Sequence, residues 1–100
     1  MKSRQECINI IVSHADDLHT KYGVRSLILF GSVARDEQRE DSDVDVLVDM
    51  PPHLLDACAV ADYLEELLGC KVDLVRRHKN LSPFFLKQIQ NDGIPVFHTA

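Results

Sequence analysis

The run from Asp43 to Val48 constrains the fold more than any other part of the sequence, because two kinds of side chain alternate along it. Successive residues of a strand point to opposite faces of a sheet. Its three valines then share one face, and the other face carries two carboxylates, Asp43 and Asp45, followed by Leu47. We therefore expect a strand with one buried face and one face that begins with acidic groups.

The apolar patterns on either side of this strand predict an α/β (α+β) fold in a single domain, residues 1–100. Apolar residues spaced three and four apart predict helices over residues 3–22, 54–68 and 82–91, with a short helix after residue 30. β-branched and apolar runs predict strands over residues 24–30, 44–48, 71–75 and 94–97. Pro95 restricts the last strand to a sheet edge. The expected architecture is a small mixed sheet packed with helices.

Two of these helices have apolar stripes that predict which residues are buried. In the first helix the stripe consists of Ile8, Ile11, Ala15, Leu18 and Tyr22. In the helix over residues 54–68 it consists of Leu54, Cys58, Ala61, Leu64 and Leu68. Gly23, Gly69 and Gly93 are placed to end the three helices.

Composition excludes several classes of protein. The formal net charge of −5 argues against a general nucleic-acid-binding surface, which needs clustered Lys and Arg. The apolar run from Ile8 to Val12 is too short for a signal peptide or a membrane span, so we expect a cytoplasmic protein. Three widely spaced cysteines without a Cys-x-x-Cys pair support neither a disulfide framework nor a zinc site. We expect them to be reduced packing residues.

Asp43, Asp45 and Asp73 are the candidate metal-binding acids. Two carboxylates that are separated by one residue on a strand lie on the same face, and their Cα atoms are about 6.5 Å apart. Carboxylate oxygens are the ligands that Mg²⁺ prefers, and one carboxylate can bridge two ions. Asp73 joins them if the strand over residues 71–75 neighbours the strand over 44–48. Acidic residues on a strand can also be simply its solvated face, and that alternative remains open here.

Gly31 and Ser32 directly follow a predicted buried strand. Backbone amides at such a strand-to-helix turn can bind phosphate, and glycine allows close approach because it has no Cβ. The serine hydroxyl adds a hydrogen-bond donor. The segment is neither a P-loop nor a dinucleotide-binding fingerprint, because the glycines and lysine of those motifs are absent.

Together, Gly31-Ser32, ten intervening residues and Asp43-x-Asp45 match the signature of the polymerase-beta-like nucleotidyltransferase superfamily. The longer string from Phe30 to Val48 resembles stand-alone minimal nucleotidyltransferase (MNT) domains, which are similar to antitoxins paired with HEPN-domain ribonuclease toxins. The resemblance extends over residues 24–97 and includes the later Val-Asp-Leu-Val at residues 72–75.

The resemblance implies an Mg²⁺-dependent nucleotidyltransferase that transfers a nucleoside monophosphate, AMP from ATP, to a hydroxyl group. By this resemblance Gly31 and Ser32 hold the triphosphate, Asp43 and Asp45 bind two Mg²⁺ ions, and Asp73 is the third acid. It also implies a protein partner, a HEPN-type toxin modified on a tyrosine. Two alternatives remain: an antitoxin that neutralises its partner by contact alone, and a small-molecule nucleotidyltransferase.

One residue departs from the family pattern, and several basic residues have two interpretations. The family's usual Ala-Arg-Gly is Ala34-Arg35-Asp36 here, so a turn suited to glycine must hold a Cβ. Arg35 reaches a phosphate or, as we favour, pairs with Asp41 or Asp43. The basic residues at 76, 77 and 79 form a solvated turn or approach the triphosphate. The five histidines show no metal-ligand spacing and are expected at the surface.

Overall fold

The sheet at the centre of the molecule has four strands in the order β3-β2-β1-β4. The computed structural model describes residues 1–99. β1 pairs antiparallel with both β2 and β4, and β2 pairs parallel with β3, which confirms the expected mixed sheet. The elements in chain order are α1 (Arg4–Ser13), α2 (Ala15–Tyr22), β1 (Ser26–Phe30), α3 (Gly31–Ala34), β2 (Val44–Asp49), α4 (Leu54–Leu68), β3 (Val72–Arg76), α5 (Pro83–Asp92) and β4 (Ile94–His98).

The predicted first helix is two helices, α1 and α2, interrupted at His14. The Ser13 hydroxyl donates to the carbonyl of Asn9 over 2.8 Å, and His14 Nδ1 lies 2.8 Å from the carbonyl oxygen of Ile10. Side chains that bond the preceding turn in this way compete with the backbone ladder and bend helices. The periodicity of apolar residues continues through the interruption, so the sequence pattern alone did not indicate it.

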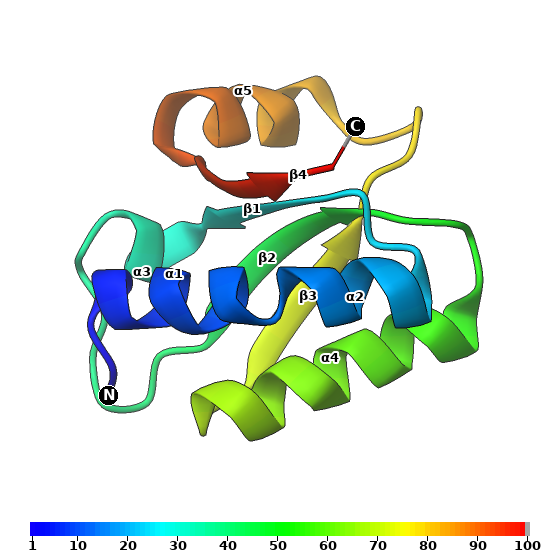
Figure 1. Ribbon diagram of the computed structural model, residues 1–100. Coiled ribbons are helices and arrows are strands. Elements are labelled where there is room, and N and C mark those ends of the chain that lie inside the picture. Colours follow the sequence, from blue (N-terminus) through cyan, green and yellow to red (C-terminus); the bar gives the residue numbers. More distant parts are fainter. Residues whose placement is uncertain (100) are drawn as a thin grey trace.

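Helices α1, α2 and α4 cover one face of the sheet (Figure 1). The core on this face is formed by residues that are almost fully buried, among them Cys7, Ile11, Leu18, Leu29, Val46 and Leu64. The predicted stripe of α1 and α2 is confirmed at Ile11 and Leu18.

The predicted stripe of α4 is wrong in its first half. Leu54 is 78% exposed and Cys58 is also exposed, whereas Val60 is fully buried and Ala57 packs against the core. Leu64 and Leu68 are buried as predicted, and the inward face continues from them to Val60 and Ala57. The packing role expected for the cysteines holds for Cys7, which is buried, and fails for Cys58; both are free, as is Cys70.

A second, smaller core lies on the other face of the sheet, under α5. Phe30, Leu47 and Ile89 are its buried members, and Phe30 meets Phe85 edge to face with ring centroids 5.3 Å apart. Ser82 caps α5, since its hydroxyl accepts a hydrogen bond from the Phe85 amide over 3.1 Å. This core covers only part of the face, because α5 packs on Ile28, Leu47 and Val75 rather than on the acidic residues.

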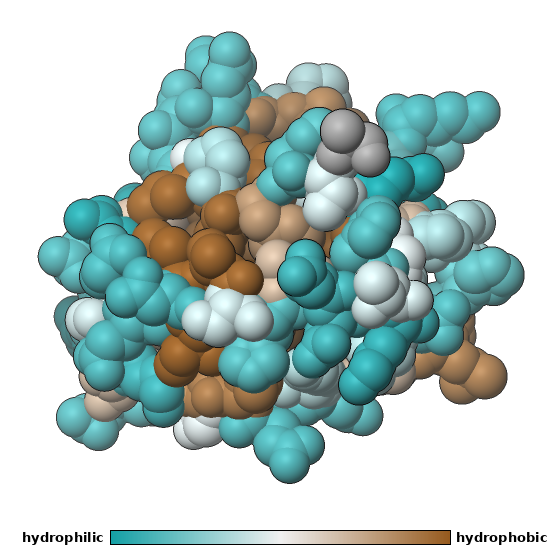
Figure 2. Space-filling view, in the orientation of Figure 1, coloured by the Kyte–Doolittle hydropathy of each residue, from teal (hydrophilic) through white to brown (hydrophobic). Residues whose placement is uncertain are grey.

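The sheet ends at β4 on one side, and the position predicted for Pro95 in an edge strand is confirmed. The pairing of β4 with β1 shifts register between Leu27 and Ile28. The surface seen in Figure 2 is largely hydrophilic, with a hydrophobic patch above α1. Within residues 1–99 no helix is long and apolar enough to cross a membrane. The cytoplasmic location stays a prediction.

Candidate active site

Asp45 and Asp73 lie side by side on neighbouring strands. The parallel register of β2 and β3 pairs Asp45 directly with Asp73, which confirms the expectation that the two strands are neighbours. Asp43 precedes the first residue of β2, Val44. The valines of β2 are buried under α1, α2 and α4, so the acids lie on the opposite face, beyond the end of the smaller core.

Among the candidate metal-binding acids, Asp45 has surroundings that change its pKa. It is half-buried, whereas Asp43 and Asp73 are exposed. Burial raises the pKa of Asp45 to about 6, with further contributions from the charges of Asp73 and Asp43 and from a hydrogen bond with Asp73. The positive charge of Arg35 lowers the pKa and offsets part of this rise. The carboxylates therefore repel one another, and an added cation would relieve that repulsion.

Gly31 lies against the carboxylate of Asp45. Its φ is 76°, a conformation that side chains with a Cβ disfavour. A Cβ at this position would overlap Oδ2 of Asp45 and lie 2.9 Å from its Cγ. Phe30, the preceding residue, pairs with Asp45 in the β1–β2 register. Glycine is thus required here by the position of the Asp45 carboxylate. The sequence pattern indicated only the approach of phosphate as a reason for glycine.

Ser32 lies in the first turn of α3, directly after Gly31. The N–H groups at the start of a helix have no acceptor inside it. The carbonyls of this segment are used within the turn: Gly31 accepts from the amide of Arg35 over 3.2 Å, and Ser32 from that of Glu37 over 2.8 Å. Ser32 is half-buried, and its binding to phosphate stays a prediction.

Arg35 forms ion pairs, but not with the predicted partners. Its Nε lies 2.6 Å from Oε1 of Glu37, and one of its terminal nitrogens lies 4.0 Å from Oδ2 of Asp92. The predicted ion pair with an acidic neighbour is confirmed, but the neighbour is Glu37 rather than Asp41 or Asp43, because Glu37 is two residues away in the same turn, and α5 brings Asp92 to the other side. Arg35 thus lies between the end of α5 and Asp45, whose pKa its charge lowers.

Asp36, at the position where the family pattern has glycine, adopts a φ of 61°. The turn has therefore kept the left-handed conformation that glycine favours, and aspartate is among the residues that adopt it at modest cost. The amide of Asp36 donates to the carbonyl of Val33 over 3.0 Å, which closes the turn after α3.

The chemistry of this donor set fits Mg²⁺, because carboxylates are hard oxygen ligands and the repulsion around Asp45 would be relieved by a cation. Within residues 1–99 no group of three or more His, Cys, Asp or Glu side chains is arranged to hold a metal ion. The structure pairs Asp45 with Asp73, and the arrangement of all three acids around metal stays a prediction.

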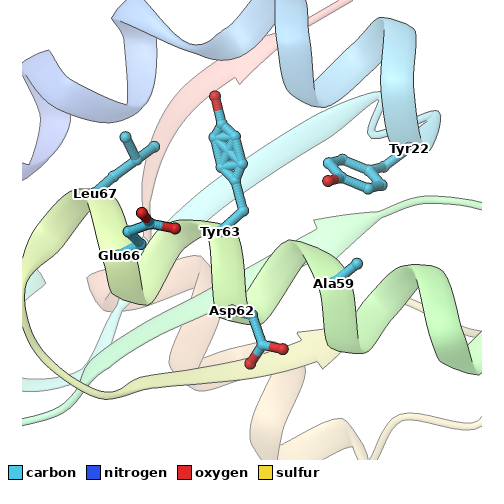
Figure 3. A pocket seen from close by; sticks show the side chains of 6 residues that line it. All are labelled: Tyr22, Ala59, Asp62, Tyr63, Glu66 and Leu67. Carbon is cyan, nitrogen blue, oxygen red and sulfur yellow. The ribbon is translucent and has the colours of Figure 1, made fainter.

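The other residues singled out in the sequence lie elsewhere. Arg77, His78 and Lys79 are exposed, as expected for a solvated turn, and Arg76 donates to the carbonyl of Arg77 over 3.1 Å. A cavity of about 520 Å³ opens between α2 and α4, on the other side of the sheet from the acids. Tyr63 points from α4 into this cavity with Tyr22 facing it (Figure 3).

Comparisons with known proteins find a matching family model and similar proteins. A family model described as nucleotidyltransferase domain matches residues 11–96. The chain is 42% identical over 98 residues to a Methanocaldococcus jannaschii protein named "Putative protein adenylyltransferase MJ1217", covering 96% of this chain and 100% of that protein. It is 44% identical over 79 residues to "Protein adenylyltransferase MntA" of Thermococcus cleftensis, covering 77% of this chain and 80% of that one.

A similar solved structure is described as "Crystal structure of the toxin-antitoxin with AMP-PNP". It has a TM-score of 0.73 and 26% sequence identity, over 92% of this chain and 73% of the other. The fold, the spacing of the motif and the relatives therefore agree.

Proposed function

The chain belongs to the nucleotidyltransferase domain family, and we propose that it transfers AMP from ATP to a hydroxyl of a partner protein, a tyrosine of a HEPN-type toxin. The observation that carries the proposal is the pairing of Asp45 with Asp73 beside Gly31. The relatives named protein adenylyltransferases and the toxin–antitoxin neighbour support the choice of a protein acceptor.

The residues of the site have separate roles in this proposal. Asp43 and Asp45 would hold two Mg²⁺ ions with help from Asp73, and bound Mg²⁺ would supply charge neutralisation of the triphosphate. The amides at Gly31 and Ser32 and the Ser32 hydroxyl bind the phosphates. Gly31 keeps this turn close to the carboxylate of Asp45, because no Cβ separates them.

Asp73 would accept the proton of the acceptor hydroxyl, a role supported by its exposure on the edge strand β3 next to Asp45. The hydroxyl oxygen forms a bond to the α-phosphorus, the bond from that phosphorus to the β-phosphate oxygen breaks, and pyrophosphate leaves. Positioning of the hydroxyl opposite the leaving pyrophosphate is then the main contribution of the protein.

The test uses ATP labelled in its α-phosphate, Mg²⁺ and a HEPN-type toxin as the candidate partner protein. We expect label on the partner and release of pyrophosphate from the wild type, and neither from Asp45→Asn. Asp49→Asn is a matched control, because Asp49 lies on the same strand but pairs with Arg25 over 3.2 Å, away from Asp73. Label confined to small molecules, or equal loss in both variants, would refute the proposal.

A further inference from the structure

Helix α5 carries an exposed flank that leads to the active site. Phe85 and Ile89 point into the smaller core, so residues on either side of them flank the helix. One flank holds Phe84, Gln88 and Asp92, spaced four apart and therefore in one row. A groove of about 390 Å³ follows this row, lined also by Lys87 and Asn91.

The two ends of the row differ in character. At one end Asp92 lies 4.0 Å from the guanidinium of Arg35, whose charge acts on Asp45. At the other end Phe84 is 81% exposed, although its neighbour Phe85 packs against Phe30. The exposed ring of Phe84 is therefore free to be covered by an apolar side chain of a partner.

We propose that this flank of α5 is the docking surface for the polypeptide that carries the acceptor hydroxyl. The inference rests on the proposed transfer to a protein, and it extends that proposal by naming where the acceptor binds. Phe84 would take an apolar side chain of the partner, and the amides of Gln88 and Asn91 would hydrogen-bond its backbone. The row ends beside Arg35, whose charge acts on Asp45, so a segment lying along it would lead toward the acids.

The distances and charges favour a polypeptide over other occupants. Two turns of helix separate Phe84 from Asp92, roughly 12 Å at 1.5 Å per residue. An extended peptide covers that length with about four residues. An RNA acceptor is disfavoured, because Lys87 is the one basic side chain that lines the groove within the described residues and the chain has a net charge of −5.

The experiment replaces Phe84 with the photo-crosslinking residue p-benzoylphenylalanine, and Leu86 likewise as a matched control. Leu86 is on the opposite flank of the same helix and is 39% exposed. The probe is the same HEPN-type toxin that serves as the candidate partner in the transfer assay. We expect crosslinking from position 84 and not from position 86. Equal crosslinking from both positions, or none from position 84, would overturn the docking surface.

A kinetic measurement separates docking from nucleotide binding. In Phe84→Ala we expect the KM for the partner to rise about tenfold, with kcat and the thermal stabilisation by Mg²⁺-ATP within twofold of wild type, and Leu86→Ala to match wild type throughout. Reduced stabilisation by Mg²⁺-ATP in Phe84→Ala would mean that the flank holds nucleotide instead.

The two proposals fail in different ways. Crosslinking from position 84 without transfer of label would leave the docking surface intact and refute the transfer. Transfer of label with an unchanged KM in Phe84→Ala and no crosslinking from position 84 would keep the transfer and refute the docking surface.

Discussion

The two faces of strand β2 contrast sharply although they alternate residue by residue. Val44, Val46 and Val48 are fully buried against α1, α2 and α4. On the other face Asp43 is exposed and Asp45 half-buried, and burial resumes at Leu47. One face thus fixes the position of the strand, and it holds the acids in place even though they repel one another. Stability and chemistry should therefore respond to different substitutions on the same strand pair.

The largest expected effect is loss of transfer in Asp45→Asn. We expect the rate to fall by at least about 10³-fold, or roughly 4 kcal/mol, because a metal-binding charge beside Asp73 is removed at nearly constant shape. The metal-free protein should be as stable as wild type or more so, because a repelling charge is lost. Transfer assays and thermal melts without metal measure the two effects. A melting point several degrees below wild type would indicate a structural role for Asp45.

Leu29→Ala should lower the stability and leave the rate of transfer nearly unchanged, which is the reverse of the effect expected for Asp45→Asn. Leu29 is fully buried on the core face and pairs with Val46, so truncating it should cost about 2–5 kcal/mol of unfolding free energy. At temperatures where the variant remains folded, its rate of transfer should stay close to wild type. Urea denaturation gives the stability, and the contrast between the faces fails if the rate drops as steeply as it does in Asp45→Asn.

Gly31→Ala tests a position that should contribute to both stability and transfer. The positive φ alone should cost about 1–2 kcal/mol, and the new Cβ must also displace the Asp45 carboxylate. We expect stability and transfer to fall together. Ser32→Ala, one residue along, should weaken nucleotide use while the melting point changes little. Equal losses of stability and nucleotide use in Ser32→Ala would instead assign that hydroxyl to the fold.

The smallest effect is the pH dependence of the metal-free protein. The pKa of Asp45 is raised to about 6, so the folded state binds this proton more tightly than the unfolded chain does. The free energy of unfolding that this tighter proton binding contributes is fully present below pH 4 and is lost as the pH rises through 6. Because solvent screens this partly exposed group, we expect a loss of about 1 kcal/mol. Chemical denaturation at pH 4 and pH 7 should show it in wild type and not in Asp45→Asn, whereas Asp49→Asn should retain it.

Local patterns in the sequence predicted the strands and the acidic face well. Alternation between valine and aspartate specifies which side of β2 is buried without any knowledge of neighbouring elements, and Ser82-Pro83 marks the start of α5 by its own cap chemistry. The pairing of Asp45 with Asp73 was predicted only on the condition that their strands were neighbours. Strand order depends on how α4 packs, and no local pattern reports that.

The features that were missed depend on contacts between distant residues. Leu54 and Cys58 fit a helical stripe by spacing, but the face of α4 that packs into the core continues to Val60 and Ala57 instead. The partner of Arg35 on α5, Asp92, is far away along the chain. The close approach of Gly31 to Asp45 likewise follows from the antiparallel register of β1 and β2.

The parallel pairing of β2 with β3 also has a consequence for the order of folding. β1 and β2 are joined by one short helix and a loop and pair antiparallel, whereas β3 can pair with β2 only after α4 has crossed over the sheet. Closing such a crossover costs more chain entropy than closing the β1–β2 connection. We therefore expect Asp73 to reach Asp45 late in folding, so the capacity to bind metal should appear after most of the β1–β2 pairing has formed.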